Sequence, residues 1–243
     1  MFKQMWESFN FKKGGDYIMA ETEITVQVLE DFMTVCNKLE NLGFEKTGKF
    51  RLNDWYFSKY SDKDLNTFGY GRAISSSVLV REIIGKEHKK VLCYKAKILD
   101  DEGNVVSEEK IQTEIDDIEK TILLLNLAGL NMWEEVKDKT VTYKKDNIEL
   151  CLQNIEDLGV FIELEELPEM KSLTPDEKFA RLKRIVKSFG LKLGKDFSCK
   201  KVYMKFKNRL KEQSGVHETL PYEIRAKLEK QNAWLMDFLK DKE

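Results

Sequence analysis

Cysteine, histidine and proline are scarce in this chain. Its 243 residues include four cysteines, two histidines and three prolines. The cysteines stand far apart with no Cys-x-x-Cys pair, which argues against a disulfide framework or a zinc cluster and favours a reducing compartment. Because only His88 and His217 are present, a histidine-rich metal centre or a histidine-based triad has little support. Any metal would therefore be a hard ion bound by oxygen.

Long apolar runs are also missing. No apolar stretch approaches the roughly 20 residues that a membrane-spanning helix needs, so we expect no membrane association. Residues 1–18 contain Glu7 and Asp16 and lack the apolar core and cleavage site of a secretory signal, so they are expected to form an N-terminal extension. With 42% hydrophobic and 35% charged residues, the composition is that of an ordinary globular protein. The expected location is the cytoplasm.

The net charge of −2 conceals a strong segregation of charge along the chain. Residues 171–215 hold 14 Lys and Arg against four Asp and Glu, whereas residues 1–170 hold 22 against 33. The basic segment 171–215 is a possible contact surface for a protein partner or another polyanion; nucleic acid is not the expected partner. The commoner explanation of such a pattern is that the basic segment folds back on the acidic part or forms solvated helix faces.

Alternation of polar and apolar residues predicts about eight strands with short, antiparallel connections. The stretch 21–28, ETEITVQV, is the first of them, and it places its acidic residues on one face. Further strands are expected at 50–57, 76–83, 90–99, 105–115, 139–146, 147–153 and 159–166. By periodicity alone, an open sheet with one solvated face is the preferred interpretation, and a barrel with a wet interior is the other.

Helical periodicity interrupts and follows these strands. Helices are expected over residues 29–43 and 116–129, each ended by a glycine. The sequence Thr174-Pro175-Asp176-Glu177 is a favourable helix start, with threonine as the N-cap and glutamate at the third helical position. The residues after about 196 are helical in character. Lys200 and Lys201 are expected on a helix surface, and residues 211–243 are expected to form a C-terminal helical tail.

The segment YKKDNIELCLQNIEDLGVFIELE, residues 143–165, resembles the CYTH family. This family comprises class IV adenylate cyclases and thiamine or inorganic triphosphatases, and is also called the triphosphate tunnel metalloenzymes. Other blocks resemble family motifs in the same order: an opening E-x-E strand, LENLGF, LNDWYF, VLVRE, CYKAK and KKVYMKF. The similarity covers roughly residues 21–210, so a CYTH-like domain is expected over residues 19–210.

The resemblance implies an α+β fold, an eight-stranded antiparallel β-barrel of the triphosphate tunnel type with flanking helices. It also implies Mg²⁺ or Mn²⁺ as cofactor and a triphosphate-bearing small molecule as ligand: a nucleotide, thiamine triphosphate or tripolyphosphate. The positions that match the family's metal-binding acids are Glu21, Glu23, Glu163 and Glu165. The candidate phosphate-binding residues are Arg81 and Lys95, which match family positions, and Lys97 as a further cation.

Several other positions depart from the family pattern and make the catalytic motifs degenerate. Lysine or arginine is expected where this chain has Thr25, Leu79, Asp138 and Thr140, and an aspartate where it has Gln153. On a further strand the family's charges are inverted or lost, at Glu108, Lys110 and Gln112. Lys137 and Lys139 stand one step out of phase and are expected on the opposite face.

Two functions follow from this pattern. The first is a metal-dependent enzyme, either a phosphohydrolase acting on a triphosphate or a lyase of the class IV adenylate cyclase type. The second is a non-catalytic protein of the same fold that binds an anionic ligand or a protein partner.

Overall fold

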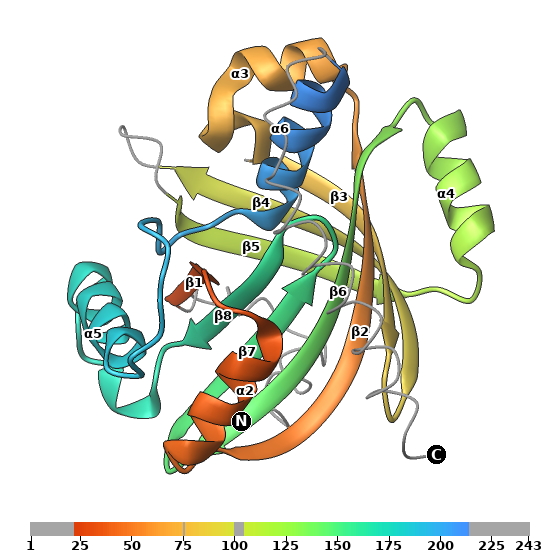
Figure 1. Cartoon of the computed structure of the whole chain (residues 1–243). Coiled ribbons are helices and arrows are strands. Elements are labelled where there is room, and N and C mark those ends of the chain that lie inside the picture. Colours follow the sequence, from red (N-terminus) through yellow and green to blue (C-terminus); the bar gives the residue numbers. More distant parts are fainter. Residues whose placement is uncertain (1–21, 75, 100–104, 214–243) are drawn as a thin grey trace.

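The computed structural model of the chain describes residues 22–74, 76–99 and 105–213 (Figure 1). Three predictions fall partly or wholly outside this range: the N-terminal extension, the candidate ligand Glu21, and the C-terminal helical tail beyond Gln213.

Eight antiparallel strands form one sheet, which confirms the predicted strand number and pairing. Their order across the sheet is β1-β8-β7-β6-β2-β3-β4-β5 (Figure 1). The strands are β1 (Glu23–Val28), β2 (Glu45–Ser58), β3 (Ser76–Ile84), β4 (His88–Leu99), β5 (Val105–Glu114), β6 (Asn131–Lys145), β7 (Ile148–Ile155) and β8 (Gly159–Glu165). Strands β2 and β6 begin earlier than predicted and pair with each other along almost their whole length.

The closed barrel expected from the family resemblance is not confirmed. Strands β1 and β5 are the two edges of the sheet, and within the described residues no pairing joins them. The short segment before α6 (Lys201–Gln213) covers the edge of β1 instead. Thr25 donates its N–H to Phe197 and accepts a hydrogen bond from the N–H of Cys199, at 3.1 and 3.0 Å. This covering satisfies backbone groups that an exposed edge would leave open to other chains.

Five α-helices and one 3₁₀ turn accompany the sheet in the described residues. They are α2 (Phe32–Asn41), α3 (Asp62–Ile74), α4 (Ile118–Leu127), η1 (Pro168–Met170), α5 (Pro175–Lys187) and α6 (Lys201–Gln213). The predicted start of α5 is confirmed, because the Thr174 hydroxyl and the Glu177 carboxylate cap each other's backbone N–H groups. Helix α3 was not predicted, since its sequence, DKDLNTFGYGRAI, holds two glycines and no clear apolar stripe.

The main hydrophobic core lies on one face of the sheet, where α2 and α5 pack against it (Figure 1). Ile24 and Val26 of β1 and Ile162 and Leu164 of β8 point into this core and are buried. A smaller core forms where α6 packs, and it includes Phe161, Trp133 and Phe206. Since successive strand residues alternate between faces, the strand residues that alternate with Ile24, Val26, Ile162 and Leu164 lie on the opposite face of the sheet, here called the inner face. No helix in the described part of the chain is long and apolar enough to cross a membrane.

Candidate metal and phosphate site

Strand register places the predicted site residues on the inner face. Residues directly opposite in an antiparallel pair lie on the same face. Glu23 lies opposite Glu165, and Thr25 lies opposite Glu163. Followed from strand to strand, the same face carries Gln153, Thr140, Asp138, Asp54, Arg81, Lys95 and Lys110. Lys97 occupies the position opposite Glu108 in the β4–β5 register.

Three carboxylates form an acidic cluster at one end of this face. One oxygen each from Glu23, Glu163 and Glu165 lies within 4.8 Å of the others. Glu163 and Glu165 are half-buried, whereas the Glu23 side chain reaches solvent. Desolvation by the surrounding protein and the negative charge of Glu163 nevertheless raise the pKa of Glu23. The three acids are therefore crowded enough that they favour a positive charge between them.

Lys201, the first residue of α6, reaches into this cluster. Its Nζ lies 2.7 Å from Glu163 Oε2 and 2.9 Å from Gln153 Oε1. Gln153 also donates to Glu163 Oε2 through Nε2, at 3.3 Å. Desolvation raises the pKa of Glu163, but the charge and the hydrogen bond of Lys201 outweigh it, and the pKa lies below its ordinary value. The prediction that Lys201 lies on a helix surface is wrong, because the helix docks with its first turn against the site.

Lys95 links the two distant sides of the sheet. It belongs to β4, near one edge, whereas Glu23 and Glu163 belong to β1 and β8 at the other. Its charge nevertheless opposes the rise in the pKa of Glu23 and contributes to the lowered pKa of Glu163. The curvature of the sheet brings these strands toward each other (Figure 1). Lys110 lies directly opposite Lys95 on β5. The inner face thus places two lysines of adjacent strands on the side facing the acidic cluster.

Arg81 is engaged by a carboxylate of the protein itself. Its Nε and Nη2 donate to the two oxygens of Asp54 at 2.7 and 2.6 Å, and the two side chains are only 18% and 7% exposed. Burial disfavours the charge of Arg81, but Asp54 more than offsets this effect and raises the pKa of the guanidinium. The structure therefore places Arg81 on the predicted face, in a cross-strand ion pair with Asp54.

Asp138 and Thr140 occupy the interior where the family resemblance led us to expect cations. Asp138 is 5% exposed, and the Thr140 hydroxyl donates to its Oδ1 at 2.8 Å. Burial raises the pKa of Asp138 to about 7. Lys137 points to the opposite face, as predicted from its phase, and pairs with Glu135 at 3.2 Å. Three of the four candidate acids thus lie together on the inner face, while Asp138 and Thr140 stand where cations were expected.

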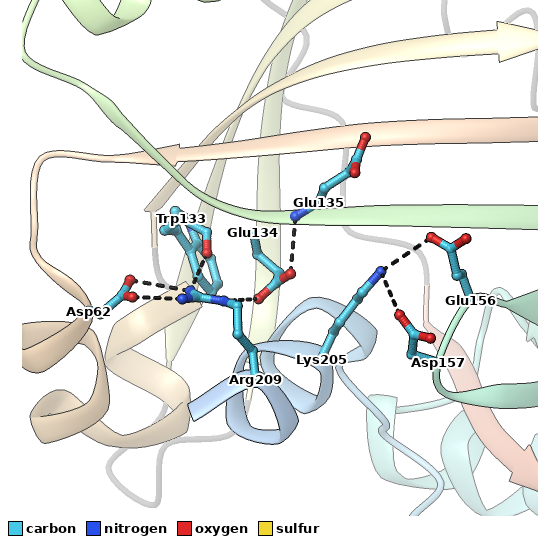
Figure 2. Close-up of polar contacts among 8 residues, drawn as sticks. All are labelled: Asp62, Trp133, Glu134, Glu135, Glu156, Asp157, Lys205 and Arg209. Carbon is cyan, nitrogen blue, oxygen red and sulfur yellow. Dashed lines mark hydrogen bonds and ion pairs between the residues drawn. The ribbon is translucent and has the colours of Figure 1, made fainter. Parts of the chain in front are cut away.

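Helix α6 is held in place by a stripe of cations at a spacing of four residues. Lys201 is the first of them; Figure 2 shows the other two, Lys205 and Arg209, reaching acids of other elements. Lys205 Nζ lies 3.7 and 3.6 Å from the Glu156 and Asp157 carboxylates. Arg209 binds Asp62 at 2.8 Å, Glu134 at 3.1 Å and the carbonyl oxygen of Trp133 at 2.6 Å. In this helix the basic segment folds back on the acidic part of the chain, as predicted.

The sequence alone does not identify the partners of three polar residues around the site. In the sequence, Asp54 is part of a family-like strand, Lys201 is expected on a helix surface, and Asp138 stands in place of a cation. A period-two pattern gives the face of Asp54 and Asp138 but not their partners. The position of Lys201 follows from the docking of a helix that comes 38 residues after Glu163 in the chain, and no local signal reports it.

Known proteins that resemble this chain come from archaea and bacteria. A protein of Methanocaldococcus jannaschii named "putative adenylate cyclase" is 27% identical over 193 residues, which cover 78% of this chain and 99% of that protein. The PH1012 protein of Pyrococcus horikoshii is 24% identical with a TM-score of 0.56, over 76% of this chain and 98% of that one. The Pyrococcus structure shares the fold of this chain.

A structure from Vibrio parahaemolyticus described as a "putative adenylate cyclase" adds a more distant match. It is 15% identical with a TM-score of 0.54, and covers 80% of this chain and 99% of that one. No family model matches the chain. The Pyrococcus and Vibrio structures therefore share the fold of this chain.

Proposed function

We propose that the inner face binds a divalent cation at Glu23, Glu163 and Glu165 and, together with it, the triphosphate group of a small molecule. The observation that carries the proposal is the cluster of three carboxylates from β1 and β8, with oxygens within 4.8 Å of one another. Carboxylate oxygens at this spacing suit Mg²⁺ or Mn²⁺, which prefer hard oxygen ligands. A bound cation also relieves the repulsion among the three acids. Glu21, two residues before Glu23, is a fourth proposed ligand.

The proposed phosphate contacts come from the lysines on the facing strands. Lys95 and Lys110 lie opposite each other on β4 and β5, and Lys95 already acts electrostatically on Glu23 and Glu163. Ammonium groups in this position form charge-assisted hydrogen bonds with phosphate oxygens. Lys97 and Arg81 complete the proposed set. Arg81 contributes only by sharing its donors between Asp54 and the ligand, because Asp54 engages two of them.

The proposed reaction is phosphoryl or nucleotidyl transfer. Glu23, Glu163 and Glu165 would hold the cation, which would supply neutralisation of the charge that develops on the phosphate oxygens. The lysines hold the triphosphate in line with its attacking oxygen, which is the ribose 3′-hydroxyl in an adenylate cyclase or water in a triphosphatase. The name of the Methanocaldococcus jannaschii relative favours the cyclase, with ATP as substrate and cyclic AMP and pyrophosphate as products.

A second candidate function is favoured by the state of the basic residues. Arg81 is paired with Asp54. The buried residue Asp138 is an acid at a position where the family resemblance leads us to expect a phosphate-binding cation. Each lost charge-assisted hydrogen bond removes about 1.5 to 3 kcal/mol. Three or four such losses would remove roughly 5 to 10 kcal/mol, which corresponds to many powers of ten in rate. On this alternative, the protein binds a cation and an anionic ligand without turnover.

One experiment separates the two functions. The full-length protein is incubated with ATP, tripolyphosphate or thiamine triphosphate and with Mg²⁺ or Mn²⁺, and cyclic AMP, pyrophosphate and phosphate are measured. Mn²⁺ binding is followed in parallel by electron paramagnetic resonance. Glu163→Gln is the test variant and Glu135→Gln, on the opposite face, is the matched control.

Each outcome has a distinct meaning. Turnover that Glu163→Gln abolishes and Glu135→Gln preserves supports the enzyme. Mn²⁺ binding without product from any substrate supports the non-catalytic protein. Failure of the protein to bind Mn²⁺, with or without a triphosphate, overturns the metal site itself.

A further inference from the structure

We infer that Lys201 is a built-in competitor for the divalent cation: its ammonium occupies Glu163 in the metal-free protein, and a cation binds fully only when that ion pair opens. This inference concerns the regulation of the site described above and rests on the proposed function. It gives the N-terminal turn of α6 a role in metal binding, in addition to that of the three acids.

The contacts of Lys201 are directed at a carboxylate oxygen of Glu163, one of the three acids of the proposed metal site. Glu163 Oε2 receives the ammonium of Lys201 at 2.7 Å and the amide of Gln153 at 3.3 Å. Lys201 also donates to Gln153 Oε1 at 2.9 Å, which closes a triangle of three side chains. A divalent cation that takes this oxygen meets a positive charge within a few ångströms. At that separation the repulsion is large unless the ammonium moves away.

Lys201 is held at the cluster by the docking of its helix. Val202 and Phe206, on the neighbouring face of α6, are buried in the smaller core. Arg209, two turns further on, binds Asp62, Glu134 and the Trp133 carbonyl (Figure 2). Just before the helix, Cys199 is hydrogen-bonded to Thr25 of β1. Because both ends are fixed, the ammonium does not leave Glu163 without a change in side-chain rotamer or a shift of α6.

The Lys201–Glu163 pair differs from an ordinary structural ion pair in the effect that removal of the lysine has on metal binding. The Lys201 side chain is 23% exposed and that of Glu163 is 19% exposed, so removal of the lysine leaves a carboxylate in a partly desolvated site beside two other acids. Such a group gains more from an incoming cation than it did before. A purely structural role predicts lower stability with unchanged or weaker metal binding, whereas competition predicts lower metal-free stability with tighter metal binding.

The matched pair of variants is Lys201→Met and Lys205→Met. Both lysines belong to α6 and lie one turn apart, but Lys205 pairs with Glu156 and Asp157, away from the acidic cluster. Full-length protein freed of metal with a chelator is titrated with Mn²⁺ alone, and binding is measured by electron paramagnetic resonance and by calorimetry. Circular dichroism verifies that each variant is folded. Lys201→Gln, which also removes the charge, replaces Lys201→Met if that variant does not fold, and Lys201→Arg is the control that keeps the charge.

We expect Lys201→Met to bind Mn²⁺ about 10- to 100-fold more tightly than the wild type, the range that loss of one charged hydrogen bond corresponds to. Lys205→Met and Lys201→Arg should stay within about threefold of the wild type. Added Mn²⁺ should also raise the Tm of Lys201→Met more than that of the wild type.

The failures of the two proposals are distinguishable. Equal or weaker Mn²⁺ binding by Lys201→Met, in a wild type that does bind, overturns the competition and leaves the metal site intact. Absence of Mn²⁺ binding in both proteins overturns the metal site. A gain in Lys201→Met that survives addition of Glu163→Gln also contradicts the inference, because the competition acts through that carboxylate.

Discussion

Arg81 on β3 lies directly opposite Asp54 on β2, and its guanidinium donates a hydrogen bond to each oxygen of that carboxylate. The pair joins two central strands of the inner face and leaves both side chains largely shielded from water. Paired in this way, the arginine is a fixed part of the sheet, and any anion it binds has to compete with Asp54.

Replacement of Asp54 by asparagine is expected to destabilise the fold. The change leaves a shielded guanidinium without its counter-charge, which typically costs about 3 to 5 kcal/mol. Urea denaturation monitored by circular dichroism gives the free energy of unfolding. The control is Glu135→Gln, which breaks the more exposed Lys137–Glu135 pair and should cost less than about 1 kcal/mol. Equal losses of unfolding free energy in the two variants would contradict a structural role for the Arg81–Asp54 pair.

Arg209→Lys is expected to weaken the docking of α6 even though it keeps the charge. The arginine uses its planar fork to bind Asp62, Glu134 and a carbonyl oxygen at once, and a lysine reproduces only part of that geometry. We expect a loss of roughly 1 to 3 kcal/mol in the free energy of unfolding. Hydrogen exchange should show faster exchange in α6 than in the wild type, with α2 unchanged as the internal reference.

The strands of this fold could be predicted because period-two alternation is strong and local. The same alternation placed Glu163 and Glu165 on one face, and it placed Lys137 out of phase with the interior, as the structure shows. The closed barrel was expected from family resemblance, not from periodicity, and the described residues give an open sheet whose β1 edge is covered by the chain. The segment that covers the β1 edge is distant from β1 in the sequence, so the alternation pattern of the strands does not predict this covering.

The partners of the site residues could not be predicted for a different reason. Ion pairs such as Lys201–Glu163 and Arg81–Asp54 depend on which of several acids a cation meets after docking. The chain contains 43 Asp and Glu residues, and the sequence does not show which of them lies nearest to a given cation in the fold. The raised pKa of Asp138 could not be predicted either, because it comes from burial, which only the folded structure shows.

Glu23→Gln is expected to reduce the mutual repulsion of the acidic cluster. Because the charge of Glu163 contributes to the raised pKa of Glu23, removal of one negative charge should raise the Tm of the metal-free protein at pH 7. The same change removes a proposed ligand, so Mn²⁺ should raise the Tm of the variant less than that of the wild type. Differential scanning fluorimetry with and without Mn²⁺ measures both. A lower metal-free Tm would argue against crowding of the acids.

Asp138 is expected to make the protein less stable as the pH rises toward neutrality. Its pKa is raised from an ordinary value near 4 to about 7 in the folded protein, so between these values the folded state binds more protons than the unfolded state. The free energy of unfolding then falls with pH, by up to about 1.4 kcal/mol per pH unit across this interval, and the cost is complete above the folded pKa.

The test compares Asp138→Asn with Asp146→Asn, an exposed residue of the β6–β7 turn. At pH 8, Asp138→Asn should be more stable than the wild type by a few kcal/mol, because the neutral amide avoids the cost of the buried charge. At pH 5 the advantage should shrink to about 1.5 kcal/mol, because the folded carboxyl is then still protonated and the pH lies only about one unit above the pKa of the unfolded state. Asp146→Asn should follow the pH dependence of the wild type. Urea midpoints measured from pH 5 to pH 8 decide the matter: a wild-type slope in Asp138→Asn would show that another group is responsible.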